Sequence, residues 1–115
     1  NVWGSGTPLR EFIYSKDIGK LTNWALENYD ESEPIIFSTS QEISIKDLVG
    51  LIVAIIGFEG DVVWQSDKPD GQFRKPSSNK KLMSYVPDFK FTPIEVGLKE
   101  TIGYFIQNYP NLRGV

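Results

Sequence analysis

The longest apolar run of the chain, LVGLIVAIIGF, covers residues 48–58 and is interrupted by two glycines. A run of this length is too short to cross a bilayer, which takes about 20 apolar residues. Just before the run, Ser44 and Asp47 provide a Ser-x-x-Asp pattern that is typical of a helix start, and Gly57 is suited to end the helix. The sequence therefore predicts a buried helix that begins after Ser44, ends near Ile56 and does not span a membrane.

The other predicted elements are short and alternate between strand and helix. Apolar spacing predicts a helix over residues 16–29 that Ser15 would cap, and one or two helical turns after Ser77 or Ser78. The last helix, over residues 93–109, has the clearest start, because Thr92 and Glu95 form a capping box around Pro93. Strands are predicted at residues 10–14, 35–38 and 62–64. The fold class is thus mixed α/β (α+β), a single domain over residues 1–115 with about three helices and a small, short-stranded sheet.

The composition excludes several kinds of chemistry. The chain has no cysteine and no histidine, which removes disulfides, thiolate metal sites and the usual general base. None of the five tyrosines has a lysine four positions later, so a Tyr-x-x-x-Lys reductase pair is absent. A net charge of −3 argues against general nucleic-acid or membrane-surface binding. Because the sequence opens without methionine, we expect a piece of a longer protein, although processing or tag removal would leave the same start.

A cationic loop, KPDGQFRK, spans residues 68–75 of this acidic chain. Pro69, Asp70 and Gly71 together have the composition of a tight turn. After the turn, Arg74 and Lys75 can present donors to a phosphate or a carboxylate. Lys68 is more simply interpreted as a solvated side chain.

A second candidate site lies at the start of the chain, in VWGSGTPLREF. Dinucleotide and P-loop fingerprints need a strand, a glycine-rich turn and then a helix, whereas a strand follows the glycines here. The functional interpretation is therefore a side-chain site, in which Trp3 offers its indole N–H and Arg10 a bidentate fork. A surface turn with Trp3 packed on the core explains the same residues equally well.

Four segments together resemble a known family: VWGSGTPLREFIYSKDIGKL, SIKDLVGLI, GDVVWQSDKPDGQFRK and PDFKFTPIEVGLKETIGYF. They are similar to the C-terminal part of the GDP-L-fucose synthases, which belong to the extended short-chain dehydrogenase/reductase family. The resemblance implies that Trp3 and Arg10 contact the diphosphate region of the substrate and that Lys75 also reaches the phosphates. It implies further that Asp70 binds the nucleotide sugar through hydroxyl groups.

The resemblance also implies what the complete enzyme does. Members of the family convert GDP-4-keto-6-deoxy-D-mannose to GDP-L-fucose by 3,5-epimerisation and NADPH-dependent 4-reduction, as cytoplasmic homodimers. Their catalytic Ser, Tyr and Lys, their epimerising Cys and His and their NADPH site lie in an N-terminal domain that no position here matches. This chain is therefore expected to be an inactive substrate-binding domain with no catalytic, cofactor-binding or metal-binding residue.

Two alternatives remain at the level of the sequence. One is another nucleotide-sugar epimerase or reductase with a different base or sugar. The other is a stand-alone, non-catalytic module that binds anions or a protein partner through the cationic loop. A Tyr-x-x-x-Lys motif and a glycine-rich strand-turn-helix encoded upstream would favour the enzyme, whereas a start codon next to Asn1 would favour the module.

Overall fold

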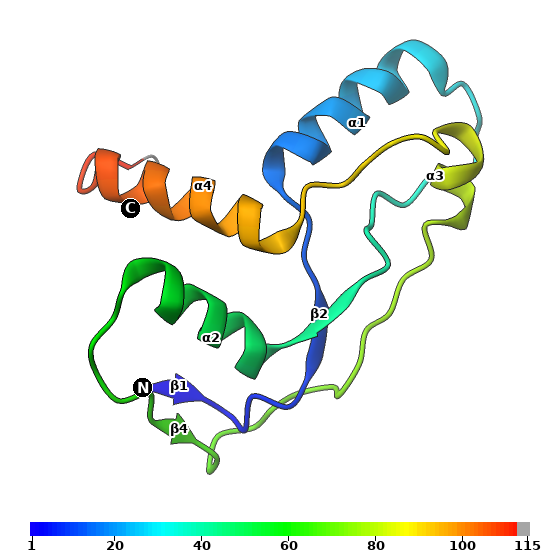
Figure 1. Ribbon diagram of the computed structural model, residues 1–115. Helices are drawn as coiled ribbons and strands as arrows, with labels where there is room; N and C mark the ends of the chain where they lie inside the picture. Colours follow the sequence, from blue (N-terminus) through cyan, green and yellow to red (C-terminus); the bar gives the residue numbers. More distant parts are fainter. Residues whose placement is uncertain (113–115) are drawn as a thin grey trace.

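A computed structural model describes residues 1–112 of the chain, and these residues form a mixed α/β fold, as predicted (Figure 1). Within this range there are four helices and four very short strands. In chain order the elements are β1 (Val2–Trp3), β2 (Leu9–Glu11), α1 (Ser15–Asn28), β3 (Glu42–Ser44), α2 (Ile45–Ile56), β4 (Trp64–Gln65), α3 (Lys80–Tyr85) and α4 (Ile94–Asn108).

The strands form two separate pairs rather than one small sheet. β1 and β4 are parallel, with Val2 opposite Trp64, and β2 and β3 are antiparallel, with Arg10 opposite Ile43. The first pair brings the N-terminal glycine segment beside the chain that enters the cationic loop. The second pair leads directly into α2, because β3 ends at the residue that caps this helix.

The strand predicted at residues 35–38 is wrong, since this segment has no strand neighbour in the described part of the chain. A strand is stabilised by backbone hydrogen bonds to an adjacent strand. The apolar side chains that prompted the prediction are not fully buried either, and Ile36 is 52% exposed.

Helix α2 follows its local sequence signals. The Ser44 hydroxyl accepts a hydrogen bond from the backbone N–H of Asp47 at 3.0 Å, and Gly57 ends the helix with a φ of 65°. The predicted burial of this helix is wrong, however, because none of its residues is fully buried.

The caps predicted for the other helices are not used. Tyr14, and not Ser15, occupies the cap position of α1, and it makes no side-chain cap bond. Pro93 is likewise the cap residue of α4 and not its first helical residue. Thr92 does not form the expected capping box, because its backbone N–H and hydroxyl donate to the buried carboxylate of Asp17, at 2.7 and 3.0 Å. This contact joins the first turn of α1 to the start of α4.

Helix α3 packs against the end of α1 through aromatic side chains. Leu21 and Leu82 are the fully buried apolar side chains of the described residues, and both are 0% exposed. The rings of Trp24 in α1, Tyr29 just after α1 and Tyr85 in α3 contact one another, with centroids 5.5–6.5 Å apart. A small aromatic and aliphatic cluster thus holds α3 against the end of α1.

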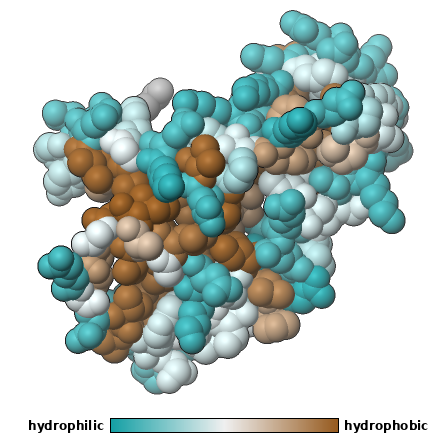
Figure 2. Space-filling view, viewed as in Figure 1, coloured by the Kyte–Doolittle hydropathy of each residue, from teal (hydrophilic) through white to brown (hydrophobic). Residues whose placement is uncertain are grey.

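Much apolar surface elsewhere is exposed. A compact domain of 115 residues has a radius of gyration of about 13 Å, whereas that of this chain is 16.8 Å. Apolar side chains gather on the surface where α2 and α4 face each other (Figure 2), and several of them are about half exposed or more. On these two helices they are Ile56, Val96, Tyr104, Phe105 and Ile106. A surface of this kind marks an area that normally contacts other protein.

A polar cluster around Glu11 ties β2 to two distant loops. The Glu11 carboxylate accepts hydrogen bonds from the Ser38 hydroxyl at 2.7 Å, from the Ser77 backbone N–H at 3.0 Å and from the Ser77 hydroxyl. Partial burial would raise the pKa of Glu11, but these donors stabilise the charged form and lower the pKa overall.

The Glu11 cluster predicts a loss of stability in acid. A carboxyl whose pKa is lowered on folding stabilises the folded state above its unfolded pKa of about 4.3, and this contribution is lost as the pH falls through the folded pKa. We therefore expect Glu11→Gln to lower the free energy of unfolding at pH 7 more than at pH 3. Urea denaturation at the two pH values measures this difference. Glu59→Gln, at an exposed loop position, serves as the control, and an equal pH dependence in both variants would contradict the prediction.

Candidate functional site

The two candidate segments of the sequence meet at Asp70. One carboxylate oxygen of Asp70 accepts the backbone N–H of Ser5 at 2.6 Å, and the other accepts the Ser5 hydroxyl at 2.7 Å. These residues are 65 positions apart in the chain. The hydrogen bonds stabilise the charged carboxylate and lower the pKa of Asp70. The N-terminal glycine segment and the cationic loop therefore form one continuous surface region.

Arg10 contacts the same loop from β2. Its guanidinium donates to the backbone carbonyl of Gln72 at 2.8 Å and to that of Leu9 at 2.6 Å, with a longer contact to Phe73 at 3.5 Å. A guanidinium has five N–H donors, so two of them are not engaged by these three carbonyls. Arg10 can thus hold the loop and still present a donor pair to an anion.

Trp3 and Lys75 belong to the two segments that this junction joins. Trp3 belongs to β1 and is 73% exposed, so the alternative in which it packs on the core is wrong. Lys75 is exposed and follows the part of the loop that runs beside β2, where the Leu9 N–H donates to the Phe73 carbonyl at 2.8 Å. Among the described residues it makes no side-chain hydrogen bond or ion pair, which leaves its ammonium available.

Arg74, the other cation predicted to present donors, has a different partner. Its guanidinium forms a bidentate ion pair with the carboxylate of Glu42 on β3, with Nε 3.1 Å from Oε1. This pair stabilises the contact between the loop and β3. The candidate anion donors are therefore Arg10 and Lys75.

Two glycines allow the close approach at Asp70. Gly4 has a φ of 84°, and a Cβ built on it would lie 2.3 Å from Oδ1 of Asp70. Gly6 has a φ of 78°, and its Cβ would lie 2.6 Å from the ring of Trp64. These glycines lie between β1 and β2, without a following helix, so they do not fit the cradle of a dinucleotide phosphate.

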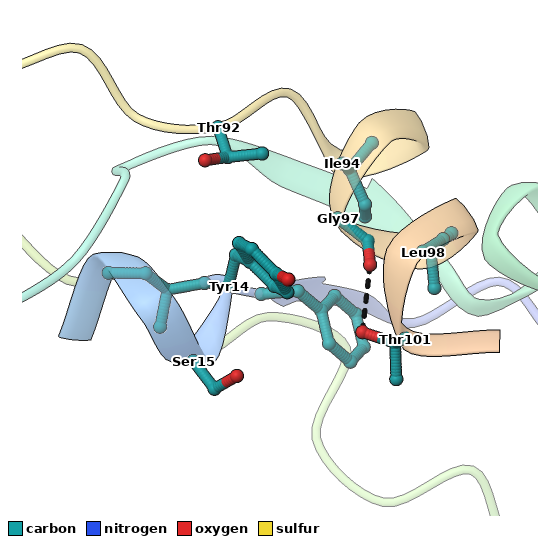
Figure 3. A pocket seen from close by; sticks show the side chains of 9 residues that line it. Tyr14, Ser15, Thr92, Ile94, Gly97, Leu98 and Thr101 are labelled. Atoms are coloured by element: carbon teal, nitrogen blue, oxygen red, sulfur yellow. Dashed lines mark hydrogen bonds between the residues drawn. The ribbon is translucent and has the colours of Figure 1, made fainter. Parts of the chain in front are cut away.

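The pockets described in this structure lie away from Asp70 in their lining residues. A cavity of about 260 Å³ lies between the start of α1 and the first turns of α4 (Figure 3). The ring of Tyr14 packs against Gly97 there, and Thr101 bonds the Gly97 carbonyl. The five pockets described along residues 1–112 do not include any of the four predicted residues in their walls. Asp70 itself is exposed, so the surface around it is open.

Ser5 was not singled out by sequence analysis, although it contacts Asp70 most closely. Its only local signal is its position between two glycines, which leaves its backbone N–H unobstructed. Pairing over 65 positions cannot be inferred from one sequence.

No cation site emerges from the described residues, which contain no group of three or more metal-ligating side chains. In the same part of the chain, no helix is long and apolar enough to span a membrane.

No family model matches the chain, but individual proteins do. The GDP-L-fucose synthase of Dictyostelium discoideum is 46% identical over 114 residues, which are 97% of this chain and 36% of that protein. The probable GDP-L-fucose synthase of Drosophila melanogaster is 40% identical with the same coverage. A crystal structure of a GDP-L-fucose synthetase from Naegleria fowleri superposes with a TM-score of 0.94 at 40% identity, over 97% of this chain and 35% of that one.

More distant structures share the fold. A GDP-6-OMe-4-keto-L-xylo-heptose reductase from C. jejuni superposes with a TM-score of 0.82 at 24% identity, over 93% of this chain and 33% of that one. The chain spans about a third of the length of the relatives it matches. The high identity, maintained over nearly the whole chain and accompanied by the same fold, shows that it belongs to the GDP-L-fucose synthase family and corresponds to the C-terminal part of its members.

Proposed function

We propose that this chain is the substrate-binding domain, residues 1–115, of a GDP-L-fucose synthase. In this proposal Trp3, Arg10, Asp70 and Lys75 form one side of the site for a GDP-sugar. The observation that carries the proposal is the junction of the two family-like segments, which Ser5 and Asp70 join by two short hydrogen bonds.

The chemistry of this surface suits a nucleotide diphosphate sugar. Arg10 keeps two N–H donors after its backbone contacts, and Lys75 is exposed nearby on the same loop. Charge-assisted hydrogen bonds to phosphate are roughly twice as strong as neutral ones. A carboxylate such as Asp70 accepts hydrogen bonds from the hydroxyl groups of a sugar, and the exposed indole of Trp3 adds an N–H and a flat apolar face.

The exposed apolar surface supports a role as part of a larger enzyme. The chain corresponds to a third of the length of its relatives, and the apolar side chains of α2 and α4 are only partly covered. In the complete enzyme we expect an N-terminal domain to cover part of this surface, to hold NADPH and to supply the catalytic residues. The complete enzyme would epimerise and reduce GDP-4-keto-6-deoxy-D-mannose, as a homodimer in the cytoplasm.

Removing the phosphate contacts tests the proposal in the full-length enzyme. We expect Arg10→Ala and Lys75→Ala each to raise the dissociation constant for GDP-L-fucose by about 10- to 100-fold, because a hydrogen bond to a charged group contributes about 1.5–3 kcal/mol. Isothermal titration calorimetry measures this change. Lys75→Ala is the more selective variant, since Lys75 makes no side-chain contact that holds the described loop.

Arg74→Ala is the matched control for these variants. It removes an arginine from the same loop, but one that pairs with Glu42, so the affinity should change by less than about threefold. Unchanged affinity in both Arg10→Ala and Lys75→Ala would contradict the phosphate role. The isolated chain should bind GDP-L-fucose weakly, because an open surface cannot enclose the ligand. Tight 1:1 binding by the isolated chain would contradict the need for a second domain.

A further inference from the structure

Ser5 holds both oxygens of one carboxylate. Its backbone N–H donates to Oδ1 of Asp70 and its hydroxyl donates to Oδ2. The same hydroxyl lies 2.8 Å from that of Thr7. A carboxylate that is held at both oxygens cannot rotate about its terminal bond without losing a hydrogen bond.

The contact leaves Asp70 able to bind something else. An ionised carboxylate offers about four lone-pair sites, and Ser5 occupies one on each oxygen. Asp70 is exposed, so its remaining lone pairs can accept hydrogen bonds from a ligand. The two hydrogen bonds from Ser5 fix the orientation of the carboxylate and therefore of these lone pairs.

The position of the loop does not depend on this contact alone. Arg10 donates to the Gln72 carbonyl, and the Leu9 N–H donates to the Phe73 carbonyl at 2.8 Å. Both contacts hold the backbone directly after Asp70. Loss of the Ser5 hydroxyl should therefore free Oδ2 of Asp70 and let the carboxylate turn about its remaining bond to the Ser5 backbone N–H, while the loop stays attached to β2.

We propose that Ser5 is a positioning residue for the nucleotide-sugar site, which orients Asp70 so that its free lone pairs accept hydrogen bonds from a hydroxyl group of the substrate. This inference rests on the proposed function, because it needs Asp70 to contact the GDP-sugar. It assigns a role to a residue that the sequence pattern did not identify.

The test compares full-length variants in steady-state kinetics with the GDP-sugar substrate. Ser5→Ala should raise KM by about tenfold and change kcat little, because it weakens binding through Asp70 and does not touch the reacting groups. Ser5→Thr keeps the hydroxyl and should restore KM to within about threefold of the wild-type value. Ser84→Ala removes a hydroxyl that bonds a backbone carbonyl of α3, far along the chain, and is the control for loss of a serine.

Two further readouts separate positioning from simple structural support. Without the Ser5 hydroxyl, the pKa of Asp70 should rise, so the acid limb of kcat/KM should move to higher pH. If Ser5 acts through Asp70, the double variant Ser5→Ala/Asp70→Asn should bind no more weakly than Asp70→Asn alone.

The outcomes distinguish this inference from the proposed function. If Asp70→Asn raises KM but Ser5→Ala changes neither KM nor the acid limb, the inference is overturned and the proposed function stands. Independent, multiplicative effects of the two substitutions overturn it as well. If Asp70→Asn leaves KM unchanged, Asp70 does not contact the substrate, and both proposals lose their basis.

Discussion

Replacing Asp17 by alanine is expected to lower the free energy of unfolding of the chain by about 3 kcal/mol. Asp17 is 1% exposed, and its carboxylate accepts the backbone N–H and the hydroxyl of Thr92. Hydrogen bonds to charged groups contribute about 1.5–3 kcal/mol each, and a buried donor that loses its partner carries a desolvation penalty. The variant would lose both bonds that connect the first turn of α1 to the entry into α4. Urea denaturation followed by tryptophan fluorescence measures the change, because Trp24 lies in α1.

Two further variants make the Asp17 prediction specific. Thr92→Val removes the hydroxyl bond and keeps the backbone bond, so its effect should be about half that of Asp17→Ala, roughly 1.5 kcal/mol. Asp88→Ala removes an exposed carboxylate and should change stability by less than about 0.5 kcal/mol. If Asp17→Ala and Asp88→Ala had equal effects, the buried carboxylate would not be a structural link between α1 and α4.

Capping signals in the sequence predicted the ends of a helix correctly where neighbouring residues supply the cap. The cap at Ser44 and the left-handed glycine at position 57 fixed both ends of α2 correctly. The same reasoning failed at Thr92, where a capping box was expected. There the buried carboxylate of Asp17, which lies 75 positions away, binds the threonine in its place. A capping signal competes with tertiary partners, and the sequence alone does not show them.

Strand predictions depend even more on distant partners. The apolar segment at residues 35–38 has the composition of a buried strand but no neighbouring strand among residues 1–112. Conversely, no strand was predicted at residues 2–3, yet β1 pairs in parallel with β4, 62 positions later by the register of Val2 with Trp64. Composition identifies a segment that can pair, whereas the presence of a partner decides whether it does.

The candidate site could be predicted in its residue types but not in its connections. The resemblance to the GDP-L-fucose synthases indicated Arg10 and Asp70, and the structure places both at the same loop. The sequence did not indicate that Arg74 forms an ion pair with Glu42, or that Ser5 donates hydrogen bonds to Asp70. These contacts depend on the antiparallel pairing of β2 with β3 and on the conformation of the two glycines beside Ser5. Both are properties of the folded chain.

Replacing Gly4 by alanine is expected to weaken binding of GDP-L-fucose to the full-length enzyme by about 100-fold, if the proposed function is correct. Two effects add. An L-residue at a φ of 84° costs about 1–2 kcal/mol, and the new Cβ would lie 2.3 Å from Oδ1 of Asp70. Because that atom accepts the backbone N–H of Ser5, the carboxylate would have to leave its place and lose its orientation.

Gly71→Ala separates the two effects of the Gly4 substitution. Gly71 also has a positive φ, of 73°, but the nearest atom to its added Cβ is Nη2 of Arg10 at 3.9 Å, an ordinary contact. The Gly71→Ala variant therefore has the same conformational cost but does not displace Asp70. The affinity of this variant for GDP-L-fucose should fall by no more than about tenfold. Calorimetric titration of both variants with GDP-L-fucose gives the comparison. Equal losses in the two would show that strain in the loop, and not the orientation of Asp70, controls binding at this surface.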